Sequence, residues 1–293
     1  MPEGNTIHWL ARRHTRDLAN HIVRVGSPQG RFAKEAKLLD RLRFRKAEAY
    51  GKHLFHHWQG GLVVHVHLGM AGWFYRFRGR PPEPRPTVRM RLAAEGVTID
   101  LIGPPTCELI KESGQREIVA RLGPDPLRAD ADSGVVLENL RRRSRPIGDA
   151  LLDQRVLSGV GNIYRNEALF LAGVHPLRST RGLTEPEWQN LWRTLQILMR
   201  RGAATGRTRT VDPREAPHPR ARRDPDDDFY VYRQERCRRC GSVLREILLS
   251  GRRMFACPRH QPRFRRVFNP GARSRRSARA APSDCDRAPL ACG

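Results

Sequence analysis

Met1-Pro2-Glu3-Gly4 is the stretch around which this chain is organised, and a helical pattern follows it at once. Apolar residues recur at helical spacing through residues 3–20, so we expect a leading helix that holds Pro2 against the first domain. Removal of Met1 would leave Pro2 as a secondary amine, which is partly unprotonated and nucleophilic near neutral pH. Glu3 is a carboxyl that could donate or accept the accompanying protons. Taken alone, the tetrapeptide favours an ordinary terminus with an acid at a helix start.

A series of short β-like runs follows the leading helix up to about residue 110. The runs cover residues 22–25, 54–58, 62–68, 73–77, 88–92 and 97–102. Gly60-Gly61 separates two of them as a hairpin turn, and residues 81–86 form a proline-rich loop between strands. This many short strands behind one helix predict a β-sandwich or a β-barrel.

The pattern becomes helical in the second half of the chain. Helices are expected at residues 112–122, 135–142, 147–152, 163–171 and 185–201. Residues 203–228 are rich in Arg, Pro and Asp and predict a mobile loop, and the arginine-rich residues after 261 predict a disordered tail. The sequence therefore predicts a multi-domain α+β fold. Its expected parts are residues 1–127 as a β-sandwich with a leading helix, 128–228 as a helical domain, 229–261 as a cysteine-containing unit and 262–293 as a basic tail.

The charge of the chain indicates a polyanionic partner. The formal net charge over 293 residues is +25, and basic residues occur along the whole length, so nucleic acid is the first candidate. No apolar run reaches the length of a membrane span, and no signal-peptide core follows the start. We expect a soluble intracellular protein.

The spacing of three cysteines and a histidine is the strongest local signal. Cys237-x2-Cys240 is followed after sixteen residues by Cys257-x2-His260, which fits a tetrahedral zinc ribbon or finger. Four protein ligands leave no open position for water, so the role would be structural. The fourth ligand is either His260 or a residue from elsewhere. A turn at Ser250-Gly251 would place Arg252 at a hairpin tip, either as a phosphate contact or as a solvated arginine.

Three further stretches carry polar or glycine-rich signals. The stretch Ser158-Gly159-Val160-Gly161-Asn162-Ile163-Tyr164-Arg165 is either a plain helix–turn–helix corner or the start of a helix whose free N–H groups could hold an anion, with Asn162 as an N-cap or a phosphate donor. Lys52 follows Gly51 at a strand start and is either a phosphate anchor or a proton acceptor. Met70 lies in the glycine-flanked stretch Gly69-Met70-Ala71-Gly72 and is either an exposed wedge for a base stack or a buried core residue.

Taken in order, these signals resemble the formamidopyrimidine-DNA glycosylase/endonuclease VIII family, over about residues 1–261. The resemblance is closest to the endonuclease VIII-like actinobacterial branch, with its Pro-Glu-Gly start and its segment Ser27-Pro28-Gln29-Gly30-Arg31-Phe32. It implies a β-sandwich, a helix–two-turn–helix domain and a zinc-finger hairpin, with DNA between the domains. The implied activity is that of a bifunctional DNA glycosylase/AP lyase of base excision repair that removes oxidised bases, pyrimidines favoured.

The resemblance also implies roles for individual residues. Pro2 would attack C1′ and form a Schiff base, and Glu3 would protonate the sugar ring oxygen before β- and δ-elimination. Lys52, Asn162 and Arg252 would hold the phosphates that flank the lesion, and Met70 would fill the void left by the flipped base. One structural zinc ion is implied. The expected partner is double-stranded DNA with a damaged base or abasic site, bound by a monomeric, cytoplasmic, nucleoid-associated bacterial protein.

The chain departs from the family pattern at four positions, one of which is Asn5, where Asp, His or Pro is more common in the branch. Thr6 stands where a second carboxylate is common, Ile102 where an arginine is common, and His260 where the fourth zinc ligand is usually cysteine. The rival interpretation is a noncatalytic DNA-binding zinc protein on the same scaffold.

Overall fold

The computed structural model describes residues 2–215 and 228–263, which belong to one compact unit. The predictions made for residues 216–227 and 264–293 lie outside these described residues. No helix in the described ranges is long and apolar enough to cross a membrane.

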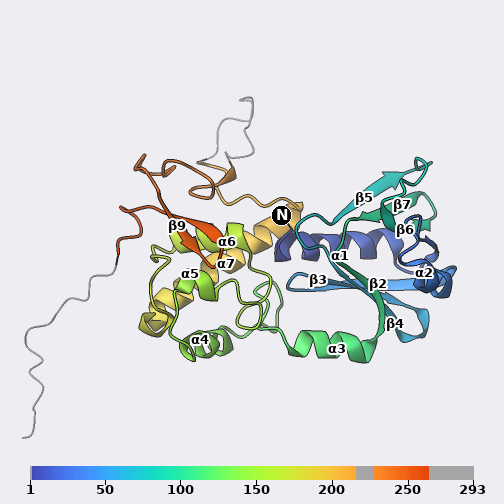
Figure 1. Ribbon diagram of the computed structural model, residues 1–293, viewed down its shortest axis with the longest axis horizontal. Helices are drawn as coiled ribbons and strands as arrows, with labels where there is room; N and C mark the ends of the chain where they lie inside the picture. The colour runs from blue at the N-terminus through green and yellow to red at the C-terminus, as the bar shows by residue number, and fades with distance from the viewer. Residues whose placement is uncertain (1, 216–227, 264–293) are drawn as a thin grey trace, which may run out of the picture. The chain divides into compact units, whose positions relative to one another are not determined.

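The first half of the chain is a β-sandwich with the leading helix packed on it, as predicted (Figure 1). The helix is α1 (Gly4–Leu18), and a second, short helix is α2 (Ala33–Leu39). The strands are β1 (Ile22–Gly26), β2 (Leu42–Tyr50), β3 (His53–Trp58), β4 (Leu62–His67), β5 (Trp73–Arg78), β6 (Val88–Ala94), β7 (Val97–Ile102) and β8 (Thr106–Lys111).

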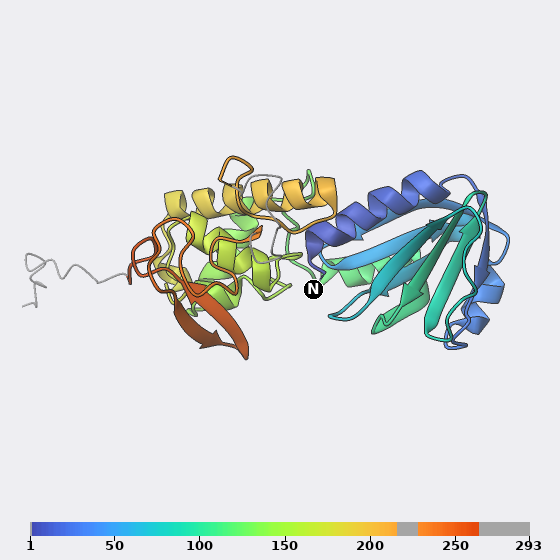
Figure 2. The same cartoon turned by 90° about the horizontal axis from the view of Figure 1, so that it is seen from above.

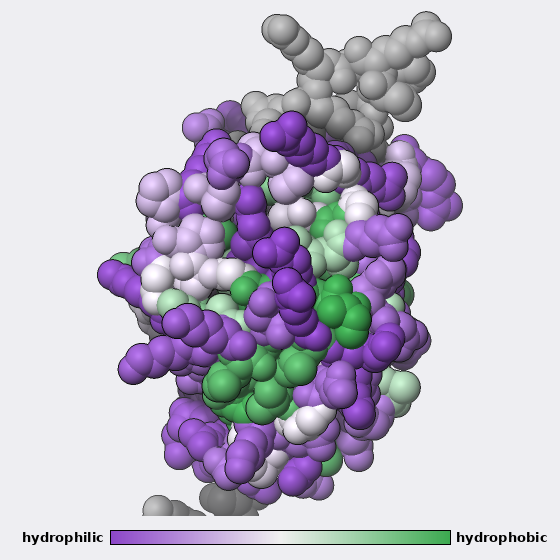
Figure 3. Space-filling model, turned by 90° about the vertical axis from the view of Figure 1, so that its right-hand side faces the viewer, coloured by the Kyte–Doolittle hydropathy of each residue, from purple (hydrophilic) through white to green (hydrophobic). Residues whose placement is uncertain are grey.

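The strands run antiparallel in the order β5-β7-β6-β1-β2-β3-β4-β8. The sheet has two halves, β5-β7-β6-β1 and β2-β3-β4-β8, which are joined by the pairing of β1 with β2. In this pairing Ile22 lies opposite Arg43 and Val23 opposite Leu42, and the short connection lets the sheet fold over into two layers. A 3-10 turn, η1 (Gln59–Gly61), links β3 to β4, which confirms the expected hairpin at Gly60-Gly61. Figure 3 shows that the outer end of the sandwich is mostly hydrophilic, with an apolar patch.

The apolar side chains of α1 explain why it lies on the sandwich. Ile7, Leu10 and Leu18 are buried, and they join the core formed by the inward-facing residues of the strands. Arg76 of β5 also donates two hydrogen bonds to Asp17 of α1, at 2.6 and 3.0 Å. Helix α1 is therefore fixed along its length, and its first turn has a defined place.

The second half is helical and ends in a hairpin. Its elements are α3 (Glu112–Ala120), α4 (Ser133–Arg141), α5 (Ile147–Ala150), α6 (Asn162–Leu171), η2 (Thr180–Gly182), α7 (Glu185–Thr205), β9 (Arg245–Leu249) and β10 (Arg252–Ala256). One apolar cluster lies between the helices, and Met254 of β10 belongs to it. A smaller cluster joins Phe170 of α6 to the segment around Tyr230 and to Cys257. The C-terminal end of α7 packs against the N-terminal end of α1 (Figure 2).

The prediction of a mobile loop at residues 203–228 is wrong at its amino-terminal end. Helix α7 continues to Thr205 and ends at Gly206, which has the left-handed conformation that commonly terminates helices. Beyond it, Thr210 and Val211 are buried. The reason is Glu167 of α6, a fully buried carboxylate that accepts hydrogen bonds from the Thr210 hydroxyl and from three backbone N–H groups at residues 230–232. A buried carboxylate requires such donors, so Glu167 fixes Thr210 and the backbone of residues 230–232.

Candidate active site and metal centre

Glu3 lies at the point where the two halves of the molecule meet. Its side chain has no exposed surface. Oε1 accepts a hydrogen bond from the backbone N–H of Ile163 at 2.7 Å, and Oε2 accepts one from Gly161 at 3.0 Å and one from Tyr164 at 3.3 Å. These donors are the free N–H groups at the start of α6, where the helix dipole favours a negative charge. The anion expected at this helix start is thus the chain's own Glu3.

The electrostatic surroundings of Glu3 act in opposite directions. Burial raises the pKa of its carboxyl above the ordinary value, while the charge of Lys52 and the N–H groups of α6 lower it. The net direction is upward, because removal from water penalises the charged form most strongly. Glu3 therefore holds a proton more readily than an exposed glutamate does.

Two glycine contacts lock the first residues onto the Ser158–Arg165 stretch. The Gly4 N–H donates to the carbonyl of Gly159 at 2.8 Å, and a Cβ added to Gly4 would lie 2.9 Å from the Gly159 Cα. A Cβ added to Gly161 would lie 2.4 Å from the Glu3 Cδ. Two of the sequence signals therefore form one structural unit, in which glycines permit the close approach.

Lys52 lies beside this unit at the start of β3. Its Nζ donates to the carbonyl of Val160 at 2.7 Å. Burial lowers the pKa of Lys52; the carboxylate of Glu3 opposes that shift, and the charge of Arg252 adds to it. Gly51, the preceding residue, donates its N–H to Asp125 at 2.7 Å, so the backbone that carries Lys52 is fixed.

A cavity of about 520 Å³ opens beside Pro2 and Lys52. Residues from five separate parts of the sequence line it: Pro2, Lys52, His67, Gly69, Met70, Arg145, Asp149, Leu152, Asp153, Gln154, Ser250 and Arg252. Sequence reasoning did not single out His67, Asp149 or Asp153 for this place. Asp149 accepts a hydrogen bond from Ser250, and Asp153 accepts one from Arg145 at 3.0 Å, so both acids are partnered.

Asn162 is the first residue of α6, and Gly161 precedes it as the N-cap. Asn162 is therefore not the N-cap that its residue type suggested. Its Oδ1 accepts a hydrogen bond from Arg165 at 2.9 Å, and its Nδ2 lies 3.5 Å from the carbonyl oxygen of Arg253. The first contact orients the amide so that its donor side faces the hairpin.

Met70 and Arg252 are both exposed, and both line the cavity beside Pro2. Met70 is 77% exposed on the loop between β4 and β5, so the buried-core alternative is wrong. Arg252 follows the turn at Ser250-Gly251, where both residues have positive φ, and it begins β10 as expected of a hairpin tip. Both residues also line a second cavity of about 630 Å³ that reaches Asn162.

The metal-ligand spacing predicted a cluster, and the structure brings its four residues together. The ligand atoms of Cys237, Cys240, Cys257 and His260 all lie within 4.8 Å of one another. Cys240 Sγ is 3.6 Å from Cys257 Sγ, and His260 Nδ1 is 3.3 Å from Cys257 Sγ. A tetrahedral zinc site with Zn–S bonds of about 2.3 Å has S–S edges of about 3.8 Å. The donor set and spacing fit one tetrahedral ion, with His260 as a ligand.

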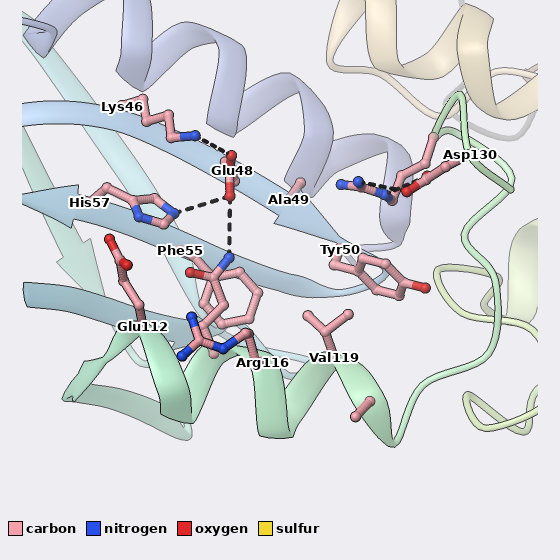
Figure 4. A pocket seen from close by; sticks show the side chains of 13 residues that line it. Lys46, Glu48, Ala49, Tyr50, Phe55, His57, Glu112, Arg116, Val119 and Asp130 are labelled. Atoms are coloured by element: carbon pink, nitrogen blue, oxygen red, sulfur yellow. Dashed lines mark hydrogen bonds and ion pairs between the residues drawn. The ribbon is translucent and has the colours of Figure 1, made fainter. Parts of the chain in front are cut away.

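A separate cavity of about 680 Å³ lies between β2, β3 and α3 (Figure 4). Glu48 in its wall accepts hydrogen bonds from Lys46 at 2.5 Å, His57 at 3.1 Å and Gln115 at 3.2 Å. The bond from His57 contributes most to holding the pKa of Glu48 below its usual range. None of the predicted site residues lines this cavity.

Comparison with known proteins settles the family. A model described as the formamidopyrimidine-DNA glycosylase N-terminal domain matches residues 1–104, and one for the H2TH domain of the same family matches residues 122–213. "Endonuclease 8 1" of Mycobacterium tuberculosis is 48% identical over 266 residues, which cover 88% of this chain and 98% of that protein. The chain belongs to the formamidopyrimidine-DNA glycosylase/endonuclease VIII family. The predicted resemblance is confirmed, including its actinobacterial branch.

Other family members are more distant. Formamidopyrimidine-DNA glycosylase of Salinispora tropica is 33% identical over 286 residues and covers 91% of this chain and 97% of its own. The crystal structure of MutM (Fpg) from Thermus thermophilus superposes with a TM-score of 0.71 at 29% identity, over 89% of this chain and 98% of that one. The Lactococcus lactis enzyme, crystallised with DNA containing an AP site, shares the fold at 22% identity with a TM-score of 0.73, over 89% of this chain and 99% of its own.

Proposed function

We propose that this protein is a base excision repair DNA glycosylase with abasic-site lyase activity, and that Pro2 is its nucleophile. The observation that carries the proposal is that Pro2 and Lys52 line one cavity, while the carboxyl of Glu3, next to Pro2 in the chain, is buried at the start of α6. Pro2 and Glu3 directly precede α1, and Lys52 directly precedes β3. The helical half contributes residues 145–154 to the lining of the cavity. A flipped nucleotide could enter this cavity while the rest of the DNA lies outside it.

The chemistry follows from the charges of these groups. The Pro2 amine attacks C1′ of the damaged nucleotide and the glycosidic bond breaks; the departing base takes the bonding electrons together with the proton that the Pro2 nitrogen loses. Glu3 donates a proton to the sugar ring oxygen, which opens the ring and leaves a cationic iminium between Pro2 and C1′. The raised pKa of Glu3 supports this acid role. The iminium acidifies C2′, so loss of its proton expels the 3′-phosphate, and a second elimination expels the 5′-phosphate.

Lys52, Asn162 and Arg252 supply the donors for the DNA backbone in this proposal. Lys52 and Arg252 are positive and line the cavity beside Pro2, and the amide nitrogen of Asn162 faces the hairpin. Met70 would enter the gap left by the flipped base, and its exposure on the loop supports this role. The partner is double-stranded DNA with a damaged base or abasic site, which the net charge of +25 favours.

We propose zinc as the ion at Cys237, Cys240, Cys257 and His260, because thiolate and imidazole donors in a closed tetrahedral set suit it. The ion would hold the base of the hairpin that carries Arg252, away from the reacting atoms. The preference for oxidised pyrimidines is proposed on the resemblance to the endonuclease VIII branch.

The test is a lesion panel on the purified, zinc-loaded protein. Labelled duplexes would carry one oxidised pyrimidine, one oxidised purine or one abasic site. We expect strand scission at the lesion with phosphates left at both ends, and faster scission at the pyrimidine. Binding of every duplex with no scission of any would favour the noncatalytic interpretation.

A further inference from the structure

Strand β5 carries an exposed aromatic stripe that the proposed chemistry does not use. Phe74 points inward, where its ring lies 4.6 Å from that of His14 in α1. Because side chains alternate along a strand, Trp73, Tyr75 and Phe77 share the opposite face. Trp73 is 41% exposed and Tyr75 is 46% exposed, and Phe77 is half-buried. Large aromatic residues placed in water contribute nothing to the core and mark a contact surface.

Positive charge surrounds the stripe. The segment from residue 73 to residue 91 contains six arginines and one acid, Glu83. The exposed side chains of Arg78, Arg80 and Arg85 form no ion pair or hydrogen bond with any part of the chain described by the structure. Strand β5 is also the first strand in the sheet order, so one of its edges is open.

The loop before β5 connects the stripe rigidly to the proposed active site. Met70 lines both site cavities, and only two residues separate it from Trp73. Gly72 donates its N–H to the carbonyl of Leu68 at 2.8 Å, and a Cβ there would lie 2.4 Å from that oxygen. The strand then leads away from the amino terminus toward the outer end of the sandwich (Figure 1). At about 3.3 Å per residue, Tyr75 lies within about 17 Å of Met70.

We infer that the Trp73–Tyr75 face binds an unpaired nucleic-acid strand next to the lesion, with bases stacked on the aromatic rings and phosphates near the free arginines. Paired bases are stacked within the duplex and offer no free faces, whereas unpaired bases stack on exposed aromatic side chains without regard to sequence. The charge around the stripe complements a phosphate backbone. The inference rests on the proposed function for the nearby lesion, but the surface is separate from the catalytic residues.

The test measures binding of a fluorescein-labelled dT 12-mer to the full zinc-loaded chain by anisotropy. Trp73→Ala and Tyr75→Ala should each weaken binding about five-fold or more, as expected when one base loses its stacking partner. Trp73→Phe should retain binding. Arg78→Ser should weaken binding and lower its salt dependence, while Arg193→Ser, which removes an exposed arginine from α7, should not.

A cleavage assay separates this surface from the site. On a fully paired lesion duplex, Trp73→Ala and Tyr75→Ala should keep kcat/KM within about two-fold of the parent protein. On a lesion in an unpaired bubble, both should lose about five-fold or more.

The inference would be overturned if the parent protein, the aromatic variants and Arg193→Ser bound the dT 12-mer with equal affinity. It would also be overturned if the aromatic variants lost kcat/KM equally on paired and bubble substrates. A parent protein that is a dimer, and that Trp73→Ala converts to a monomer, would show instead that the stripe is a protein–protein contact. Stacking-dependent dT binding without any lesion scission would refute the proposed function and leave this inference standing.

Discussion

Gly161→Ala tests whether the contact between Glu3 and α6 sets the active-site geometry. The added Cβ would lie 2.4 Å from Cδ of Glu3 and 2.6 Å from its Oε1, whereas ordinary contacts begin at 3.4 Å. The carboxyl must therefore move by about 1 Å (3.4 minus 2.4). Such a shift would stretch the 2.7 Å bond from Ile163 beyond hydrogen-bonding distance.

The expected cost follows from these distances. Each lost hydrogen bond to a charged group costs about 1.5–3 kcal/mol of stability. A misplacement of about 1 Å in a catalytic constellation lowers the rate about 100-fold. We therefore expect Gly161→Ala to fold with reduced stability and to excise a lesion about 100-fold more slowly under single-turnover conditions.

Gly26→Ala is the matched control, because a Cβ at Gly26 meets no atom within 4 Å and its φ is not positive. Urea unfolding and single-turnover excision should be measured on both variants. If Gly161→Ala remains folded and excises within about three-fold of Gly26→Ala, the position of Glu3 does not control the chemistry.

Three further predictions concern charge, the metal and pH. Arg252→Ala should slow lesion cleavage at least ten-fold, whereas Arg193→Ala on α7 should leave it within two-fold; equal effects would remove Arg252 from the DNA contact. Stripping the metal with a strong chelator should release zinc and abolish DNA binding, measured by anisotropy, because the hairpin loses its anchor; retained binding would show that the metal unit is dispensable. Burial raises the pKa of Glu3, so its proton stabilises the folded state and that contribution is lost as pH rises above the ordinary carboxyl value. The melting temperature of Glu3→Gln should therefore match that of the parent protein below pH 4.5 and rise above it as the pH increases from 4.5 to 7.5. A difference in melting temperature that does not change with pH would contradict the raised pKa of Glu3.

The parts of the fold with strong periodicity were predictable from the sequence. Helix α1 and the antiparallel strand pair β3 and β4 lie close to their expected ranges, because the apolar residues of α1 recur at helical spacing and β3 and β4 are short buried runs separated by Gly60-Gly61. Strand β2 was missed because only Phe44 and Ala49 of its nine residues are buried and an irregularity between Phe44 and Lys46 breaks the alternation. Strand β8 was missed because its residues are half-buried or exposed, which leaves no apolar face to detect.

In the site, features set by residues close together in the sequence could be predicted, and contacts between distant residues could not. The cysteine and histidine cluster was predictable because ligand spacing is a local property. The contact between Glu3 and the start of α6 joins residues about 160 positions apart, and no local pattern encodes it. The sequence feature that reflects this contact is Gly161, because any side chain there would displace the Glu3 carboxyl. His67 and Asp149 reach the cavity through the packing of β4 and α5, which periodicity alone does not place.

The identity of the nucleophile is the central claim. The most direct test incubates the protein, with Met1 removed, with abasic-site DNA and borohydride, and then maps any covalent adduct by mass spectrometry. Borohydride reduces an iminium to a stable amine, so we predict one adduct, on the peptide that begins at Pro2. Protein in which Met1 or a tag still precedes Pro2 should give none. An adduct on Lys52, or no adduct while abasic-site DNA remains bound, would contradict the account.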